Sequence, residues 1–170
     1  PPTITLGWPD AGYLDIDGNI SFIFNATDDI EFQNCSLILD DVFNTTNQTE
    51  VNNGLNTTIN VTNLGEGNHN WTINCTDTGA FTSEPAKRDF TVDLYYPDIE
   101  LNLPSNNQVL NYSNVSFNFT ANDSIDSTLN CNLTINSQDV QTFTATSGDI
   151  TNREVLNLTD GLKYWNITCY

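Results

Sequence analysis

The sequence predicts an all-β fold made of two tandem antiparallel β-sandwiches. Apolar and polar residues alternate with a period of two in short runs, turn-forming residues separate these runs, and the chain repeats itself once. No run has the periodicity of an amphipathic helix. Many short strands with frequent turns between them are typical of a sandwich.

The repeat divides the chain into two copies of one unit. Pro2 aligns with Pro97, and the alignment continues without a gap past Phe22 before a one-residue insertion. Repetition at this length indicates tandem domains rather than a solenoid of short units. We therefore expect one domain over residues 1–94 and a second over residues 95–170. Further matching pairs are Phe22 with Phe117, Cys35 with Cys131, Trp71 with Trp165, and Cys75 with Cys169.

The alternating runs predict the strands in order. In the first copy they cover residues 20–26, 34–39, 56–62, 70–76 and 90–93. The second copy repeats two of these runs over residues 115–121 and 165–169. Apolar side chains share one face of each strand, and Asn, Ser and Thr share the other. Turn signals separate the runs at Asp17-Gly18, Asn53-Gly54, Gly65-Glu66-Gly67, Thr78-Gly79 and Asp160-Gly161.

The second copy has no match for Phe90-Thr-Val-Asp93, the last strand of the first copy, and stops one residue after Cys169. We therefore expect a second sandwich that lacks its final strand, with an unpaired edge and part of its core exposed. Two explanations are open. Either these residues are a piece of a longer chain, or a neighbouring subunit donates the strand, as in β-strand addition.

The two copies resemble the immunoglobulin-like domains strung along archaeal and bacterial cell-surface proteins. Those domains often close with an L-x-[DE]-G turn, a W-x-V/I-x-A/C strand, a D-x-x-G loop and a final F-x-V-D strand. The family often has a Tyr two residues after the Gly of the turn, and this chain departs from it with His69 and Lys163. The resemblance implies an immunoglobulin-like fold at a cell surface, but not the hydrogen bond of a tyrosine corner. The matching residues are Leu64-Gly-Glu-Gly67, Trp71-Thr-Ile-Asn-Cys75, Asp77-Thr-Gly79 and Phe90-Thr-Val-Asp93, and in the second copy Leu158-Thr-Asp-Gly161 and Trp165-Asn-Ile-Thr-Cys169.

The four Cys residues allow three disulfide pairings. The repeat selects Cys35 with Cys75 and Cys131 with Cys169, because each pair then lies inside one copy. The alternative is a zinc site, but the sequence has neither a C-x-x-C motif nor a cluster of His. Disulfides indicate an oxidising, extracellular setting.

Acceptor motifs for N-glycosylation, N-x-[ST], occur more often than this composition would give by chance. An outer strand face built from Asn and Thr also produces the motif without any sugar, which is the competing explanation. We expect N-linked glycans at several motifs, with Asn44, Asn47 and Asn56 the most accessible because they lie in or near loops. The candidates are Asn19, Asn25, Asn34, Asn44, Asn47, Asn56, Asn60, Asn70, Asn74, Asn111, Asn114, Asn118, Asn122, Asn132, Asn157 and Asn166.

The formal net charge of −18 argues against binding to nucleic acid or anionic lipid, since both require cationic side chains. No apolar run approaches the roughly 20 residues that cross a membrane, so we expect no membrane insertion in this segment. Acidic clusters could bind Ca²⁺, and ordinary turn formation is the competing explanation. The candidate clusters are Asp15-Ile-Asp17-Gly-Asn19, Asp28-Asp29 and Asp40-Asp41.

The sequence contains no recognisable catalytic motif. Its one His, His69, is expected on an edge turn with no nucleophile pattern nearby. Trp71 and Trp165 have inward parity, and Trp8 is expected to be compatible with the core. We therefore expect no enzyme, and instead a structural component of an extracellular glycosylated assembly, a filament, stalk or surface layer, that contacts neighbouring copies or domains. The alternatives are an adhesin that binds a cell surface or glycan through its end loops, and accessory domains of a secreted hydrolase.

Overall fold

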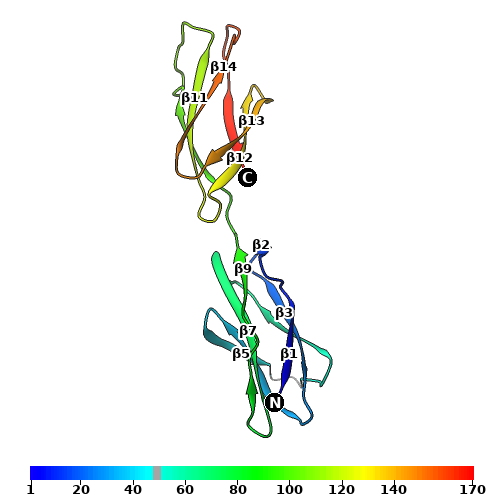
Figure 1. Cartoon of the computed structure of the whole chain (residues 1–170). Coiled ribbons are helices and arrows are strands. Elements are labelled where there is room, and N and C mark those ends of the chain that lie inside the picture. Colours follow the sequence, from blue (N-terminus) through cyan, green and yellow to red (C-terminus); the bar gives the residue numbers. More distant parts are fainter. Residues whose placement is uncertain (48–50) are drawn as a thin grey trace. The chain divides into compact units, whose positions relative to one another are not determined.

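The computed structural model describes residues 1–47 and 51–170, and the regular elements in this part of the chain are all β-strands (Figure 1). The chain forms two compact units, Pro1–Leu94 and Tyr95–Tyr170. Each unit is an immunoglobulin-like β-sandwich of two sheets, which confirms the predicted fold class.

Nine strands make up the described part of the first unit. One sheet has the order β1-β3-β6, and the other has the order β2-β9-β7-β4-β5, with β8 paired to β7. Strands β2 and β9 run parallel, whereas the other described pairs are antiparallel. The strands are β1 (Thr3–Trp8), β2 (Tyr13–Asp15), β3 (Ile20–Thr27), β4 (Phe32–Leu39), β5 (Val42–Asn47), β6 (Asn56–Val61), β7 (Gly67–Asp77), β8 (Thr82–Ser83) and β9 (Arg88–Val92).

The second unit repeats this plan with six strands and, within residues 95–170, no counterpart of β2, β8 or β9. Its sheets have the orders β10-β11-β14 and β13-β12-β15, and their pairings are all antiparallel. The strands are β10 (Asp98–Leu103), β11 (Val115–Asn122), β12 (Thr128–Ile135), β13 (Gln138–Thr146), β14 (Ile150–Val155) and β15 (Trp165–Cys169).

The period-two alternation places the two cores. Along β3 and β11 the side chains alternate between buried and more exposed in the same order in both units. Phe22 and Phe24 of β3 are fully buried, as is Phe119 of β11, and Phe117 is nearly so. Each unit has its own hydrophobic cluster between its two sheets.

The hairpin turn between β4 and β5 recurs between β12 and β13. Asp40 and Asp41 have φ values of 52° and 64°, and Asn136 and Ser137 have φ values of 51° and 64°. Two successive positive φ angles are the signature of a type I′ turn, whose twist matches that of the flanking strands. Because Asp and Asn tolerate the left-handed region better than most residues, these turns account for the polar residues at the hairpin tips.

Candidate functional site

Each unit contains one disulfide, with the pairing that the repeat predicts: Cys35–Cys75 and Cys131–Cys169. In both units the two cysteines are directly opposite on neighbouring antiparallel strands, β4 with β7 and β12 with β15. The two Cα atoms are 4.1 Å apart in each pair. Each disulfide therefore joins two strands of a single sheet and does not cross the sandwich.

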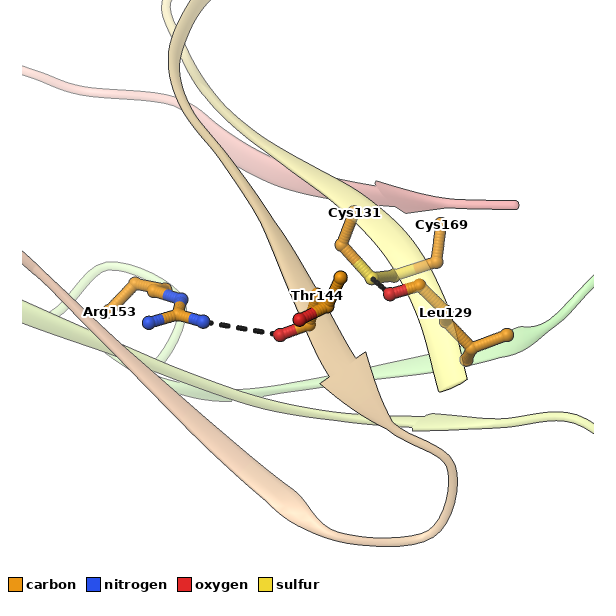
Figure 2. Close-up of a disulfide and its surroundings, with 5 residues drawn as sticks. All are labelled: Leu129, Cys131, Thr144, Arg153 and Cys169. Atoms are coloured by element: carbon orange, nitrogen blue, oxygen red, sulfur yellow. Dashed lines mark hydrogen bonds between the residues drawn. A yellow bond between two sulfur atoms is a disulfide. The ribbon is translucent and has the colours of Figure 1, made fainter. Parts of the chain in front are cut away.

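Figure 2 shows the disulfide of the second unit and a contact that links the two sheets near it. The guanidinium of Arg153, on β14, donates a hydrogen bond of 3.2 Å to the carbonyl oxygen of Thr144, on β13. The same guanidinium lies 4.2 Å from the ring centre of Phe143, a cation–π distance. Arg153 therefore ties the two sheets together at their edge strands, β14 and β13.

The structure divides the sixteen glycosylation motifs by accessibility. No described motif Asn is fully buried, and the side chain of Asn47 lies outside the described residues. Asn44, in β5, and Asn56, the first residue of β6, are exposed, as are seven other acceptors. The exposed set is Asn19, Asn44, Asn56, Asn60, Asn111, Asn114, Asn122, Asn157 and Asn166, and the half-buried set is Asn25, Asn34, Asn70, Asn74, Asn118 and Asn132.

The outer face of β7 is less open than its sequence parity predicts. Thr72 is fully buried, and its hydroxyl donates a hydrogen bond of 2.9 Å to the carbonyl oxygen of Pro85. The Nδ2 atom of Asn74 donates to a carboxylate oxygen of Glu84 at 3.1 Å. The segment between β8 and β9 therefore covers this face and engages the side chain of Asn74.

This difference predicts unequal glycan occupancy. The sugar is attached to Nδ2, and in the half-buried Asn74 this atom is hydrogen-bonded. In the exposed Asn60 the Ser21 hydroxyl, at 2.7 Å, donates to Oδ1 and not to Nδ2, and Asn166 is also exposed. We expect glycopeptide mass spectrometry of the protein from its native source to find sugar on Asn60 and Asn166 far more often than on Asn74. Equal occupancy at the three sites would contradict the accessibility argument.

The first acidic cluster forms a turn around the buried carboxylate of Asp15. Asp15 is only 5% exposed, and its Oδ1 accepts hydrogen bonds from the N–H groups of Gly18 at 2.6 Å and Asp17 at 3.1 Å. The Tyr13 hydroxyl lies 3.5 Å from the other carboxylate oxygen. Burial and the neighbouring Asp15 carboxylate raise the pKa of Tyr13. The Asp15 carboxylate therefore holds the turn, as ordinary turn formation predicts, and it does so as a buried group.

The side chains of Asp28, Asp40 and Asp41, in the other two acidic clusters, also have partners. Asp28 accepts a hydrogen bond from the Ile30 N–H at 2.9 Å, which holds the pKa of its carboxyl below the usual range. Asp40 accepts from the Asn70 N–H at 3.0 Å, and Asp41 pairs with Lys87. Within residues 1–47 and 51–170, no group of three or more His, Cys, Asp or Glu side chains is arranged to hold a metal ion.

His69 lies in strand β7, between β4 and β9, so the expectation of an edge turn is wrong. Its ring stacks on Phe90 with centroids 5.4 Å apart, Nδ1 lies 2.7 Å from an Asp40 carboxylate oxygen, and Nε2 lies 2.9 Å from the Gly65 carbonyl oxygen. The imidazole thus binds the backbone a few residues upstream, as a corner Tyr would. At the equivalent place Lys163 Nζ donates to the Asp160 carbonyl oxygen at 3.3 Å.

Two of the three Trp residues contribute to the cores as their parity predicts. Trp71 is fully buried and Trp165 is half-buried against the second core. The expectation for Trp8 is wrong: it is 39% exposed and packs at the surface against Tyr13, with ring centroids 4.4 Å apart. It follows a shift in the pairing register of β1 with β3, between Leu6 and Trp8, and this shift changes the strand's inward and outward parity.

The second unit contains a cavity of about 560 Å³ at one end of its core. It lies between the segment that follows β10 and the segment that precedes β15. Its apolar lining includes Leu101, Phe117 and Trp165, and Asp160 and Lys163 are the charged residues at its border. A shallower hollow of about 520 Å³ adjoins it at residues 110–114. Sequence reasoning predicts an exposed core here but does not identify the cavity.

The described residues include no helix long and apolar enough to span a membrane.

No protein-family model matches this chain, and no curated protein matches it. Among solved structures, fibronectin(III)-like modules of CbhA from Clostridium thermocellum are similar at 15% identity and a TM-score of 0.49, covering 99% of this chain and 85% of that one. The D00-D0 domain of Intimin is similar at 11% identity and a TM-score of 0.39, covering 99% of both chains. SGBP-B from a mixed-linkage glucan utilization locus of Bacteroides ovatus is similar at 14% identity and a TM-score of 0.42, covering 95% of this chain and 62% of that one. The likeness is one of sandwich architecture and carries no assignment of activity.

Proposed function

We propose that this chain is a structural component of an extracellular, N-glycosylated assembly, such as a surface filament, stalk or surface layer. The observation that carries the proposal is the construction of the two sandwiches. Each has one disulfide within a sheet, and nine of the described acceptor Asn side chains across the two units are exposed. Disulfides of this kind belong to oxidising compartments outside the cytosol.

The mechanism that we propose is mechanical. A disulfide between opposite residues of adjacent strands prevents those strands from separating when the unit is pulled. Sugars on the outer faces would hinder contact between sheets of neighbouring molecules, and the net charge of −18 adds repulsion. Contacts with neighbouring copies or domains are then limited to surfaces free of sugar.

A catalytic role is not part of the proposal. Among the described residues, the single His has both ring nitrogens occupied, by Asp40 and by the Gly65 carbonyl oxygen. Asp15 and Asp28 accept hydrogen bonds within their own turns, and Asp40 accepts one from the N–H of Asn70 on β7.

The proposal is tested by immunoelectron microscopy of source cells with an antibody raised against the two units. We expect label on repeating structures outside the cell. Label confined to the cell interior, or to dispersed secreted protein, would contradict the proposed role.

A second candidate function is adhesion, which one observation favours. The cavity of the second unit is bordered by Tyr112, Tyr164 and Trp165, and aromatic rings of this kind can stack on sugars. Specific binding of the two-unit chain to cells or to glycans on an array, lost on Tyr164→Ala, would favour adhesion over the structural role. No described residue favours the third class, an accessory domain of a secreted hydrolase.

A further inference from the structure

The first unit shows how a strand closes this fold. Strand β9 lies between β2 and β7, parallel to the first and antiparallel to the second, so that Phe90 is opposite both Tyr13 and His69 (Figure 1). The Phe90 side chain is 1% exposed and packs on Phe22, with ring centroids 5.8 Å apart. Val92 is fully buried beside it. Two inward side chains of β9 therefore complete this end of the core.

In the second unit the same place is a cavity. The repeat matches β2 with residues 108–110 and the first residues of β7 with residues 161–165, and both segments border the cavity of about 560 Å³. We call this cavity, with residues 108–112 and 161–165, the strand groove. Phe117 and Trp165 meet at 5.1 Å between ring centroids, as Phe22 and Trp71 do, but no third aromatic ring packs on them among the described residues.

Core residues that border the groove are more exposed than the matching residues of the first unit. Leu101 is 41% exposed, whereas its match in the first unit, Leu6, is 6% exposed. Trp165 is half-buried, whereas Trp71 is completely buried. The difference between the two units is therefore the apolar surface that a strand like β9 covers.

The backbone of the groove is also unpaired on one side. Tyr170 exchanges hydrogen bonds with Asn130 on β12, so the backbone groups of even-numbered residues along β15 face β12. Those of Trp165, Ile167 and Cys169 consequently face away from β12, toward the open edge. Strand β7 begins at Gly67, but β15 begins only at Trp165, and the matching residues 161–164 are not in a strand. We attribute the longer β7 to its pairing with β9, which covers residues 67–71.

We propose that the strand groove binds an extended polypeptide segment from outside the two units, with a basic residue, an aromatic residue and a β-branched residue at alternate positions. This is the pattern of Arg88, Phe90 and Val92 in β9. This proposal deepens the proposed structural role. It rests on that role in one respect, namely that the partner is a polypeptide of the same assembly. The binding mode is β-strand addition, in which main-chain hydrogen bonds give affinity and side-chain pockets give specificity.

The basic position follows from the contacts of Arg88. Its guanidinium donates to the carbonyl oxygens of Leu6 at 2.7 Å and Gly7 at 2.8 Å, at the end of β1. The matching residues Leu101 and Asn102 lie near the end of β10, and Leu101 lines the cavity. The second unit carries eight Asp and Glu against two Lys and Arg, an excess that favours a cationic segment.

The test extends the chain beyond Tyr170 with a second copy of residues 77–94. Tyr170 aligns with Thr76 in the repeat, so these are the residues that follow the same position in the first unit. We expect the amides of Lys163 and Trp165, which match His69 and Trp71 opposite β9, to become at least about tenfold more protected from hydrogen exchange, because the new strand hydrogen-bonds to them. The same extension with the residue equivalent to Phe90 replaced by alanine should lose at least about tenfold of this protection, since the aromatic side chain supplies the buried area. Equal protection with both extensions, or none with either, would overturn the proposal.

A second arm supplies the strand as a separate peptide of residues 87–94 to the unextended chain. Chemical shift changes in residues 108–112 and 161–165 support the proposal, and changes confined to the first unit overturn it.

Lys163→Pro removes the N–H that faces the open edge, so it should weaken peptide binding at least about tenfold, whereas Lys163→Ala keeps the N–H and should not. Dimerisation through the groove without peptide, or saturation of the groove by a glycan, would overturn the polypeptide assignment. All of these readouts use the isolated chain, so a negative result rules out strand binding but says nothing about the extracellular location and assembly, which microscopy tests. A negative result in microscopy likewise says nothing about strand binding by the groove.

Discussion

Replacing Phe90 with alanine is expected to lower the free energy of unfolding of the first unit by about 3–5 kcal/mol. The ring is 1% exposed and contacts Phe22 and the His69 imidazole, so its loss removes a large buried area and leaves a cavity that strands β2 and β7 cannot readily fill. The variant recreates in the first unit the opening that the second unit has. Hydrogen exchange read by mass spectrometry measures the two units separately.

The matched control is Phe43→Ala, which deletes the same side chain from β5 where it is 58% exposed. Its effect should stay within about 0.5 kcal/mol. The second unit should be unchanged in both variants, because its hydrophobic cluster contains no residue of the first. A Phe90→Ala effect no larger than that of Phe43→Ala would show that β9 does not close the core as described.

Removing the disulfide of the first unit, by Cys35→Ala with Cys75→Ala, is expected to cost that unit about 2–4 kcal/mol. The cross-link closes a loop with a sequence separation of 40 residues, so in the unfolded chain it removes many conformations. The second disulfide, with a separation of 38, should contribute a similar amount.

The consequence should be more severe in the second unit. It has six strands against nine and a core that is open at one end, so it has less stability to lose. We expect Cys131→Ala with Cys169→Ala to abolish its cooperative urea transition while the first unit still unfolds cooperatively. A second unit that keeps its transition midpoint would contradict this account of what holds it together.

The sandwich was predictable because period-two alternation states which face of a strand is buried. It places Phe22 and Phe117 in the cores, and the repeat alone selects the pairing of the four cysteines. The repeat also predicts an open edge in the second unit, because residues 95–170 contain no second copy of Phe90-Thr-Val-Asp93.

What the sequence could not predict depends on contacts between segments far apart in the chain. Thr72 and Asn74 have outward parity, but the segment before β9 folds over them and engages both side chains. Trp8 comes after a register shift, so counting by two assigns it to the wrong face. The parallel pair of β2 with β9 joins residues near opposite ends of the first unit, and no local pattern signals it.

The central claim is that these sandwiches are structural modules of a glycosylated extracellular assembly. The most direct test is a cryo-electron microscopy map of the assembly isolated from its native source without reduction. We predict regularly repeated copies of the two units, both disulfides intact, and density for sugar extending from exposed acceptors such as Asn60 and Asn166. Isolated particles with no repeat and bare Asn side chains at these positions would contradict the account.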